Sequence, residues 1–349
     1  MNTAPEPLDL EAYDYELPPD RIADRPAAVR HESRLLVLDR AQGRREHRRF
    51  DAIAELLRDR DLLVFNDSRV LPARVYARKV QTGGRVELLF VEPEPDGPTR
   101  WRAMARPAKG LRAGLALELE SDPGVQLRVE AEHGEGFVTV RTPYDGEALC
   151  RDHGEIPLPP YIRRAADQRD RDRYQTVYAR SDRSRSVAAP TAGLHFSPEL
   201  LARVDARGID RTTLTLDVGP GMFLPIKATS LAEHRMHHER FELRPETVDA
   251  ISRCRARGGR VVAVGTTTVR ALESLERLEP GPKSTDLFIR PGHRFRWIDE
   301  LITNFHLPKS TLVVLVAALA GREPILAAYR EAVERGYRFY SYGDAMWIR

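Results

Sequence analysis

Apolar residues fall into two patterns along this chain, and the first predicts a body of mixed strands and helices. Short apolar runs typical of buried strands occur at 34–40, 61–67, 212–218 and 260–265. Helical patterns lie between and after these runs, at 51–59, 196–208, 245–258 and 266–278. Strands and helices that follow one another in this way favour a mixed sheet covered by helices.

The second pattern, from Arg74 to Gly154, consists of short apolar or alternating runs without helical spacing. These runs are RVELLF, WRAMA, LALELE, VQLRVEAE and FVTVR. Strands at this spacing predict a small barrel or sandwich. GEIPLPPYI (154–162) then has too much proline for a helix or a central strand. We therefore predict an α/β body with a mixed sheet (residues 1–73 and 155–349) and an inserted all-β, barrel-like domain (74–154).

The ends of the predicted helices carry ordinary capping residues. Ser197 is a candidate N-cap, and the last apolar helix begins near Thr311 and ends at Gly321. Its apolar stretch, 312–320, is far shorter than the ~20 residues that a membrane helix needs. The acidic N-terminal sequence has no apolar run of the kind found in signal peptides. We expect a cytoplasmic protein that does not bind a membrane.

Cysteine and histidine spacing gives no sign of a metal site. Cys150 and Cys254 are far apart and no CxxC pair occurs, which excludes a disulfide scaffold, a four-cysteine zinc site and a cysteine-bound iron–sulfur cluster. His234 and His238 have a zinc-like i, i+4 spacing but no evident third ligand. Hydrogen-bonding roles are favoured for them, and we expect no bound metal.

Arginine is concentrated in one stretch, although the net charge of the chain is only +3. Residues 163–185 contain eight arginines and four aspartates, and 44–49 read RREHRR. Arginine forks suit phosphate, so a nucleic-acid or nucleotide partner is one interpretation. A solvated loop of mixed charge is the other.

Polar residues at the ends of predicted strands form the first part of a candidate site. NDSRVLPAR places Asn66, Asp67 and Arg69 after an apolar strand, where ligands gather in α/β folds. SYGDAM adds a carboxylate, Asp344, near the C-terminus.

A second candidate lies in VVAVGTTTVRALES, where a strand runs through a glycine into a helix that begins with threonines. Backbone N–H groups and the hydroxyls of Thr266 and Thr267 suit a carboxylate or a phosphate. Arg270 and Glu273 can join this site or form a surface ion pair with each other.

PTAGLHFSPEL forms a rigid loop before a capped helix and offers Thr191, Gly193 and His195. The histidine can serve chemistry there, or it can merely cap or pack.

ITNFHLPKSTL brings Asn304, His306 and Lys309 together directly before the most apolar helix. These side chains can be capping and solvating groups. They can also be functional groups that the adjacent core holds still.

LDVGPGMF (216–223) raises the alternative of a methyltransferase that uses S-adenosylmethionine. An acidic residue and spaced glycines after a strand are typical of its nucleotide loop, which a helix must follow. Pro225 argues against a helix there.

Taken together, these stretches and several others closely resemble the S-adenosylmethionine:tRNA ribosyltransferase-isomerase family of queuosine biosynthesis. The resemblance rests on VAAPTAGLHF, VAVGTT, TDLFI, ITNFHLPKSTL, YGDAM, NDSRVLPAR, LPPYI and RYQTVYA, and it covers nearly the whole chain. The chain departs from the family pattern at Arg185, Asp217 and Met222.

The resemblance implies an enzyme that moves the ribosyl part of S-adenosylmethionine onto 7-aminomethyl-7-deazaguanine at the wobble position of tRNA with a GUN anticodon. Epoxyqueuosine-tRNA, adenine and methionine are the products. S-adenosylmethionine is consumed as a substrate, so we expect no cofactor. The family fold is an α/β body with an inserted β-barrel. We expect a monomer.

This chemistry requires proton transfer, which makes His195 and His306 candidate catalytic groups, together with Asp344. Lys309 and Arg270 are candidates for holding the methionine carboxylate or a phosphate, and Asn304 for orienting ribose or base. The other residues named above are expected to bind substrate. A methyltransferase, which would release S-adenosylhomocysteine, and a non-catalytic tRNA-binding protein remain alternatives.

Overall fold

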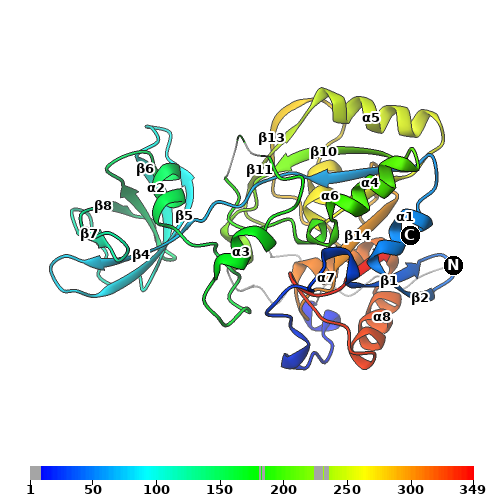
Figure 1. The fold of residues 1–349 in the computed structure, drawn as a ribbon, viewed down its shortest axis with the longest axis horizontal. Helices are drawn as coiled ribbons and strands as arrows, with labels where there is room; N and C mark the ends of the chain where they lie inside the picture. Colours follow the sequence, from blue (N-terminus) through cyan, green and yellow to red (C-terminus); the bar gives the residue numbers. More distant parts are fainter. Residues whose placement is uncertain (1–8, 181, 183–184, 224–230, 232–235) are drawn as a thin grey trace.

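The computed structural model describes residues 9–180, 182, 185–223, 231 and 236–349. It shows an α/β body and a β-barrel joined by two neighbouring chain segments (Figure 1). The predicted fold, a mixed-sheet α/β body with an inserted all-β barrel, is confirmed.

A nine-stranded mixed sheet, in the order β13-β11-β10-β3-β12-β14-β15-β1-β2, forms the centre of the body. Its strands are β1 (Arg34–Asp39), β2 (Arg44–Arg49), β3 (Leu62–Asn66), β10 (Asp210–Leu216), β11 (Glu239–Leu243), β12 (Val261–Val264), β13 (Gly281–Thr285), β14 (Glu300–Asn304) and β15 (Ala345–Ile348). The four central strands β10, β3, β12 and β14 are parallel. Their carboxyl ends therefore meet at one edge of the sheet. β15 runs antiparallel to β14 and begins at that edge, because Ala345 is the register partner of Asn304.

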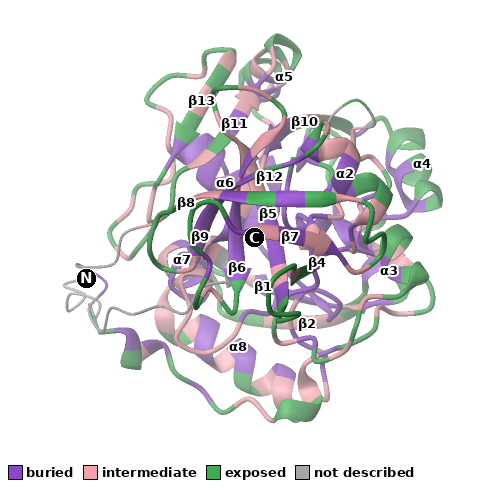
Figure 2. Ribbon diagram, turned by 90° about the vertical axis from the view of Figure 1, so that its left-hand side faces the viewer, coloured by how far each residue is buried: buried purple, intermediate pink, exposed green. Residues whose placement is uncertain are grey.

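Helices cover both faces of the sheet, as the continuous burial of the central strands β3, β12 and β14 requires. The helices of the body are α1 (Ile53–Leu56), α3 (Gln168–Arg173), α4 (Pro198–Ala206), α5 (Pro245–Ala256), α6 (Thr266–Glu273), α7 (Thr311–Ala320) and α8 (Arg322–Glu334). Leu36 and Leu38 of β1 belong to the core under α5–α8, whereas Leu35 and Val37 belong to the core under α1 and α4. Figure 2 shows buried residues along the strands and exposed residues on α4 and α5.

Short 3-10 helices occupy several connections of the body. They are η1 (Leu10–Tyr13), η2 (Pro19–Arg21), η3 (Arg30–Glu32), η4 (Phe50–Ala52), η5 (Thr191–His195) and η6 (Pro220–Phe223). In the region that suggested a methyltransferase loop, η6 follows β10, and residues 224–230 after it lie outside the described residues.

The inserted segment is a closed six-stranded antiparallel barrel with its own core. Its strands are β4 (Arg74–Lys79), β5 (Arg85–Pro93), β6 (Arg100–Arg106), β7 (Ala116–Leu119), β8 (Gln126–Glu132) and β9 (Phe137–Arg141), followed by α2 (Gly146–His153). Pairing of β4 with β7 closes the barrel. The chain returns to the body through Glu155, which exchanges backbone hydrogen bonds with Arg74.

Most of the predicted elements are present, but two helices differ from the sequence pattern. The predicted helix 266–278 ends at Glu273, because the Ser274 hydroxyl donates to the Ala271 carbonyl and competes with a further turn. The helix at Thr311 ends before Gly321 as predicted, and α8 follows it at once, although the sequence pattern did not predict that helix. Among the described residues, no single helix is long and apolar enough to cross a membrane. In the described part of the chain, one helix pair, α7 with α8, reaches that length, and the pair is bent by 117°.

Candidate functional site

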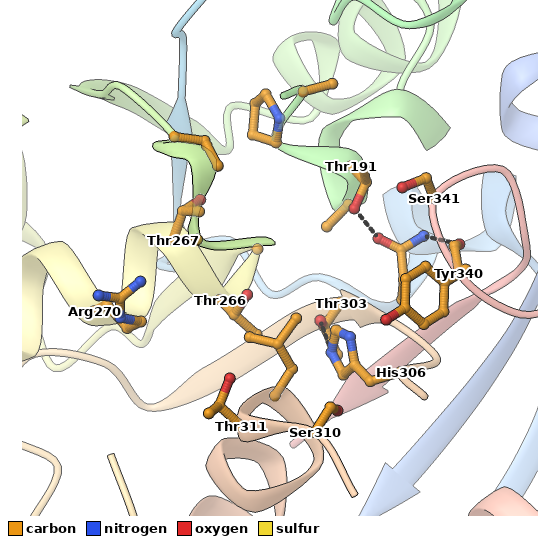
Figure 3. A pocket seen from close by; sticks show the side chains of 18 of the residues that line it. Thr191, Thr266, Thr267, Arg270, Thr303, His306, Ser310, Thr311, Tyr340 and Ser341 are labelled. Atoms are coloured by element: carbon orange, nitrogen blue, oxygen red, sulfur yellow. Dashed lines mark hydrogen bonds between the residues drawn. The ribbon is translucent and has the colours of Figure 1, made fainter. Parts of the chain in front are cut away.

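A cavity of about 260 Å³ opens at the edge of the sheet where the central parallel strands end. Its volume is near the lower end of the range of small-molecule sites, roughly 300 Å³. Its walls come from the loops after β10, β12 and β14, from η5, and from the segment before β15 (Figure 3). Six predicted site residues line it: Thr191, Thr266, Thr267, Arg270, Asn304 and His306.

Asn304, the last residue of β14, is held by hydrogen bonds on both sides of its amide. Its Oδ1 accepts from the Thr191 hydroxyl at 2.9 Å. Its Nδ2 contacts Nε2 of His195 at 3.0 Å and donates to the Tyr340 carbonyl at 3.2 Å. The loops before α4 and β15 therefore set the orientation of this amide, and the dashed lines in Figure 3 mark two of the bonds.

His195 lies behind Asn304 and does not line the cavity. Since the Asn304 amide nitrogen is a donor, Nε2 of His195 accepts and the proton is on Nδ1. Nδ1 is 2.7 Å from Oγ of Ser33, whose hydroxyl in turn donates to the Arg30 carbonyl at 3.4 Å. Burial, with the nearby Arg338 and Arg30, lowers the His195 pKa to about 3. His195 is thus a neutral imidazole with both nitrogens engaged.

His306 is the imidazole that lines the cavity. Its Nε2 is 3.0 Å from the Thr303 hydroxyl, and no hydrogen bond joins Nδ1 to another residue that the structure describes. Burial lowers its pKa to about 3, so the ring is neutral near pH 7. The Tyr15 hydroxyl donates to its carbonyl, and its N–H donates to the Tyr329 hydroxyl at 3.3 Å. A neutral imidazole at a fixed position can accept or share a proton.

The opposite wall is the start of α6, where Gly265 has φ 92° and bends β12 into the helix. This backbone conformation favours glycine. No side chain caps the first turn of α6. One turn further on, the buried Arg270 pairs with Glu239 of β11. This wall therefore presents backbone N–H groups, threonine hydroxyls and a guanidinium to the cavity.

Comparison with known proteins identifies the family of the chain. The family model described as queuosine biosynthesis protein matches residues 10–348. The chain belongs to the queuosine biosynthesis protein family. It is 55% identical over 348 residues to the S-adenosylmethionine:tRNA ribosyltransferase-isomerase of Anaeromyxobacter sp. (strain Fw109-5), covering 98% of this chain and 99% of that one.

Two further relatives agree with this assignment. The protein of the same name from Nitratidesulfovibrio vulgaris (strain DP4) is 48% identical over 361 residues, covering 97% of each chain. The crystal structure of S-adenosylmethionine tRNA ribosyltransferase from Thermotoga maritima matches with a TM-score of 0.55 and 37% identity, covering 97% of this chain and 100% of that one. The family resemblance inferred from the motifs is confirmed.

Three family-motif residues at the end of β3 and directly after it lie outside the cavity lining. Asn66 is buried and bonds the backbone of Leu216, and its Nδ2 reaches the Thr267 hydroxyl at 3.4 Å. Asp67 accepts from two threonine hydroxyls of β10, at 2.8 and 2.6 Å. Arg69 is exposed. Asn66 and Asp67 thus hydrogen-bond β3 to β10 and fix the relative position of two strands that end at the cavity.

Four more of the predicted site residues also lie away from the cavity lining. Lys309 pairs with Glu11 and Asp14, and hydrogen bonds to these carboxylates, Glu11 first, raise its pKa. The other three have structural contacts: Gly193 packs too closely on Tyr178 for a Cβ, Glu273 accepts three backbone N–H groups, and Asp344 accepts two.

The sequence pattern did not single out several residues that line the cavity. Tyr161, Tyr340 and Ser341 contribute from loops, and Glu239 contributes from β11. LPPYI, part of the family resemblance, contains Tyr161, and SYGDAM, noted for Asp344, contains Ser341 and directly follows Tyr340. These two stretches were the available signal. Among the described residues no group of three or more metal-ligating side chains occurs. His234 lies outside the described residues, and His238 is exposed near Asp286.

Proposed function

We propose that this chain transfers and isomerises the ribosyl moiety of S-adenosylmethionine onto 7-aminomethyl-7-deazaguanine at the wobble position of tRNA. Epoxyqueuosine-tRNA, adenine and methionine are the products. The observation that carries the proposal is the cavity, which the family motifs themselves build at the carboxyl ends of the parallel strands. The relatives that share this name match over their full length.

The reaction needs a base for the proton on the carbon beside the sulfonium, and the cavity offers His306 for this step. Its ring is neutral and lines the cavity, which a general base requires. Asn304 has a fixed amide that suits the ribose or the adenine. His195 acts on this chemistry through Asn304, because its own nitrogens are engaged.

We extend the proposal to the partners of the enzyme. The tRNA carries a GUN anticodon, S-adenosylmethionine is consumed as a substrate, and neither a cofactor nor a metal takes part. The enzyme acts as a monomer in the cytoplasm. Size-exclusion chromatography with light scattering tests the oligomeric state, and a panel of tRNAs that differ only in the anticodon tests the tRNA preference.

Product analysis separates this function from the two alternatives. The protein is incubated with S-adenosylmethionine and tRNA that carries the aminomethyl base, and the small molecules are separated by chromatography. Adenine and methionine in equal amounts support the proposal. S-adenosylhomocysteine would indicate a methyltransferase, and intact S-adenosylmethionine with bound tRNA would indicate a binding protein. Unmodified tRNA is the control that should give no adenine.

A further inference from the structure

The end of the cavity at α6 contains a buried guanidinium with an unused donor. The Arg270 side chain is 6% exposed, and the residue lines the cavity. Its Nε donates to the Leu287 carbonyl at 3.1 Å, and its Nη1 pairs with Glu239. Nη2 is buried and has no hydrogen-bond partner in the described part of the chain. Buried polar atoms are nearly always paired, so this nitrogen is a candidate contact for a ligand.

Glu239 gives the same end of the cavity a negative group. Its side chain is 10% exposed, and it lines the cavity next to Arg270. One carboxylate oxygen pairs with Arg270, and the other accepts weakly from the Gly219 N–H, at 3.4 Å. This second oxygen can accept hydrogen bonds from an ammonium group. A purely anionic ligand such as phosphate would meet repulsion here.

The start of α6 adds donors beside this pair. Thr266 and Thr267 line the cavity in the first turn, and no side chain caps that turn. Uncapped N–H groups at the start of a helix favour a carboxylate. In Figure 3, Thr266 lies between Arg270 and His306, so the charged end and the imidazole are on opposite sides of it in that view.

Taken together, these groups fit a zwitterion, and we infer that this end of the cavity binds the α-amino acid group of S-adenosylmethionine. The inference rests on the proposed function. Nη2 of Arg270 and the first turn of α6 hold the carboxylate, and Glu239 holds the ammonium group. Lys309, the other candidate for the carboxylate, pairs with acidic residues of the N-terminal segment instead.

This assignment gives the substrate a direction in the cavity. With the methionyl group at α6, the sulfonium and the ribose extend toward Asn304 and His306. The carbon beside the sulfonium then lies on the side of the imidazole.

A comparison of ligands and variants tests the inference directly. Binding of S-adenosylmethionine and of its decarboxylated analogue is measured by calorimetry on the full-length protein. Removal of the carboxylate should weaken binding to the wild type about 10- to 100-fold, the value of a hydrogen-bonded charge pair. In Arg270→Gln the two ligands should bind within roughly threefold of each other, because that pair is already lost. Arg270→Lys should recover part of the discrimination.

Arg260→Gln is the matched control, since Arg260 is also buried in ion pairs but lies at the start of β12, away from the cavity. It should lose stability and keep the full discrimination between the two ligands. For the ammonium group, Glu239→Gln should reduce the discrimination against the deaminated analogue. Thermal unfolding of each variant confirms that it is folded before titration.

Each outcome decides the inference separately from the function. If the wild type and Arg270→Gln discriminate equally between S-adenosylmethionine and its decarboxylated analogue, the carboxylate subsite is wrong, even when the wild type still releases adenine. A loss of tRNA affinity in Arg270→Gln with unchanged discrimination assigns the guanidinium to phosphate and also overturns it. Absence of adenine from the wild type refutes the function itself.

Discussion

The hydrogen bonds of Asn304 determine what the neighbouring histidines can do. Its amide nitrogen occupies Nε2 of His195, so that ring cannot take a proton from a substrate without breaking this bond. His306 has no such partner on Nδ1 among the described residues. Both histidines were equal candidates from the sequence, and a single buried amide now distinguishes a positioning residue from a candidate base.

Burial of both imidazoles predicts an acid-sensitive fold. Each folded-state pKa is about 3, whereas an unfolded histidine titrates near 6.5. On acidification below about pH 6.5 the unfolded state binds protons that the native state does not, so stability falls toward pH 3. The slope should be at most roughly 1.4 kcal/mol per pH unit for each histidine.

Urea unfolding between pH 7 and pH 4 measures this slope. The variant His195→Asn with His306→Asn should start less stable but lose less stability on acidification. His153→Asn, at a half-buried position on α2, is the control and should behave as wild type. An equal slope in all three proteins would contradict the account of the buried rings.

At the scale of elements, Glu273 shows how α6 holds the loop before β14. Its carboxylate accepts from the N–H groups of Arg296, Trp297 and Ile298 at 2.8 to 3.0 Å. The sequence suggested a pair with Arg270, one turn away on the same helix. The structure instead places Glu273 toward the loop and Arg270 toward β11, so the two charges serve different purposes.

Glu273→Gln should therefore reduce stability without weakening substrate binding. A neutral amide oxygen replaces a carboxylate that accepts several N–H bonds, which should cost about 1–3 kcal/mol. The control is Glu276→Gln, at an exposed position after the helix. Denaturant unfolding and titration with S-adenosylmethionine measure the two effects. Weaker binding without lower stability would restore Glu273 as a substrate ligand.

The sequence could place the strand-end residues at one edge of the sheet because their positions follow from local order. Asn304 is the last residue of β14, and Thr266 follows β12 after Gly265. The carboxyl ends of these parallel strands must meet at one edge of the sheet. Lys309 and Asp344 could not be placed in this way. Their partners, Glu11 and the N–H of Arg34, lie about 300 positions away in the sequence, so only the folded chain reveals them.

At the scale of the whole molecule, the arginine-rich segment 163–185 is partly structural. Arg164 makes a forked pair with the buried Asp170, and Arg173 donates to the carbonyls of Ala27 and Ala28. These guanidinium groups fasten the segment to the body. The exposed Arg163 and Arg169 are left as better candidates for phosphate contacts.

Arg163→Gln with Arg169→Gln should therefore flatten the salt dependence of tRNA binding. Two lost phosphate contacts should lower the slope of log K against log salt by about 1 to 2. Arg253→Gln with Arg255→Gln on α5 is a control that removes the same charge elsewhere. Filter binding at several salt concentrations gives the slopes, and equal slopes in both double variants would return the segment to a purely structural role.

The barrel joins the body at a place that permits a test of its independence. Arg74 and Glu155 pair through their backbones, so the two connecting segments lie side by side. The predicted unit 74–154 carries thirteen acidic and twelve basic residues, which gives it little net attraction for RNA. Binding of tRNA by the barrel must then depend on the local arrangement of its charges and on its shape.

Excision of the barrel should preserve the cavity, because no residue from 74–154 lines it. A protein joined from Ala73 to Glu155 by a short linker should bind S-adenosylmethionine as the full chain does and bind tRNA more weakly. Circular dichroism establishes that it folds before each ligand is titrated. A folded protein that no longer binds S-adenosylmethionine but still binds tRNA would show that the two ligands were assigned to the wrong parts of the molecule.

The most direct test of the central claim follows the proton that His306 is proposed to remove. S-adenosylmethionine labelled with tritium at the 5′ carbon is incubated with enzyme and tRNA that carries the aminomethyl base, and label released to water is counted. The wild type should release label together with adenine, and His306→Gln should slow both by at least about 100-fold while still binding S-adenosylmethionine. Release of label from His306→Gln at the wild-type rate would contradict the assignment of His306 as the base.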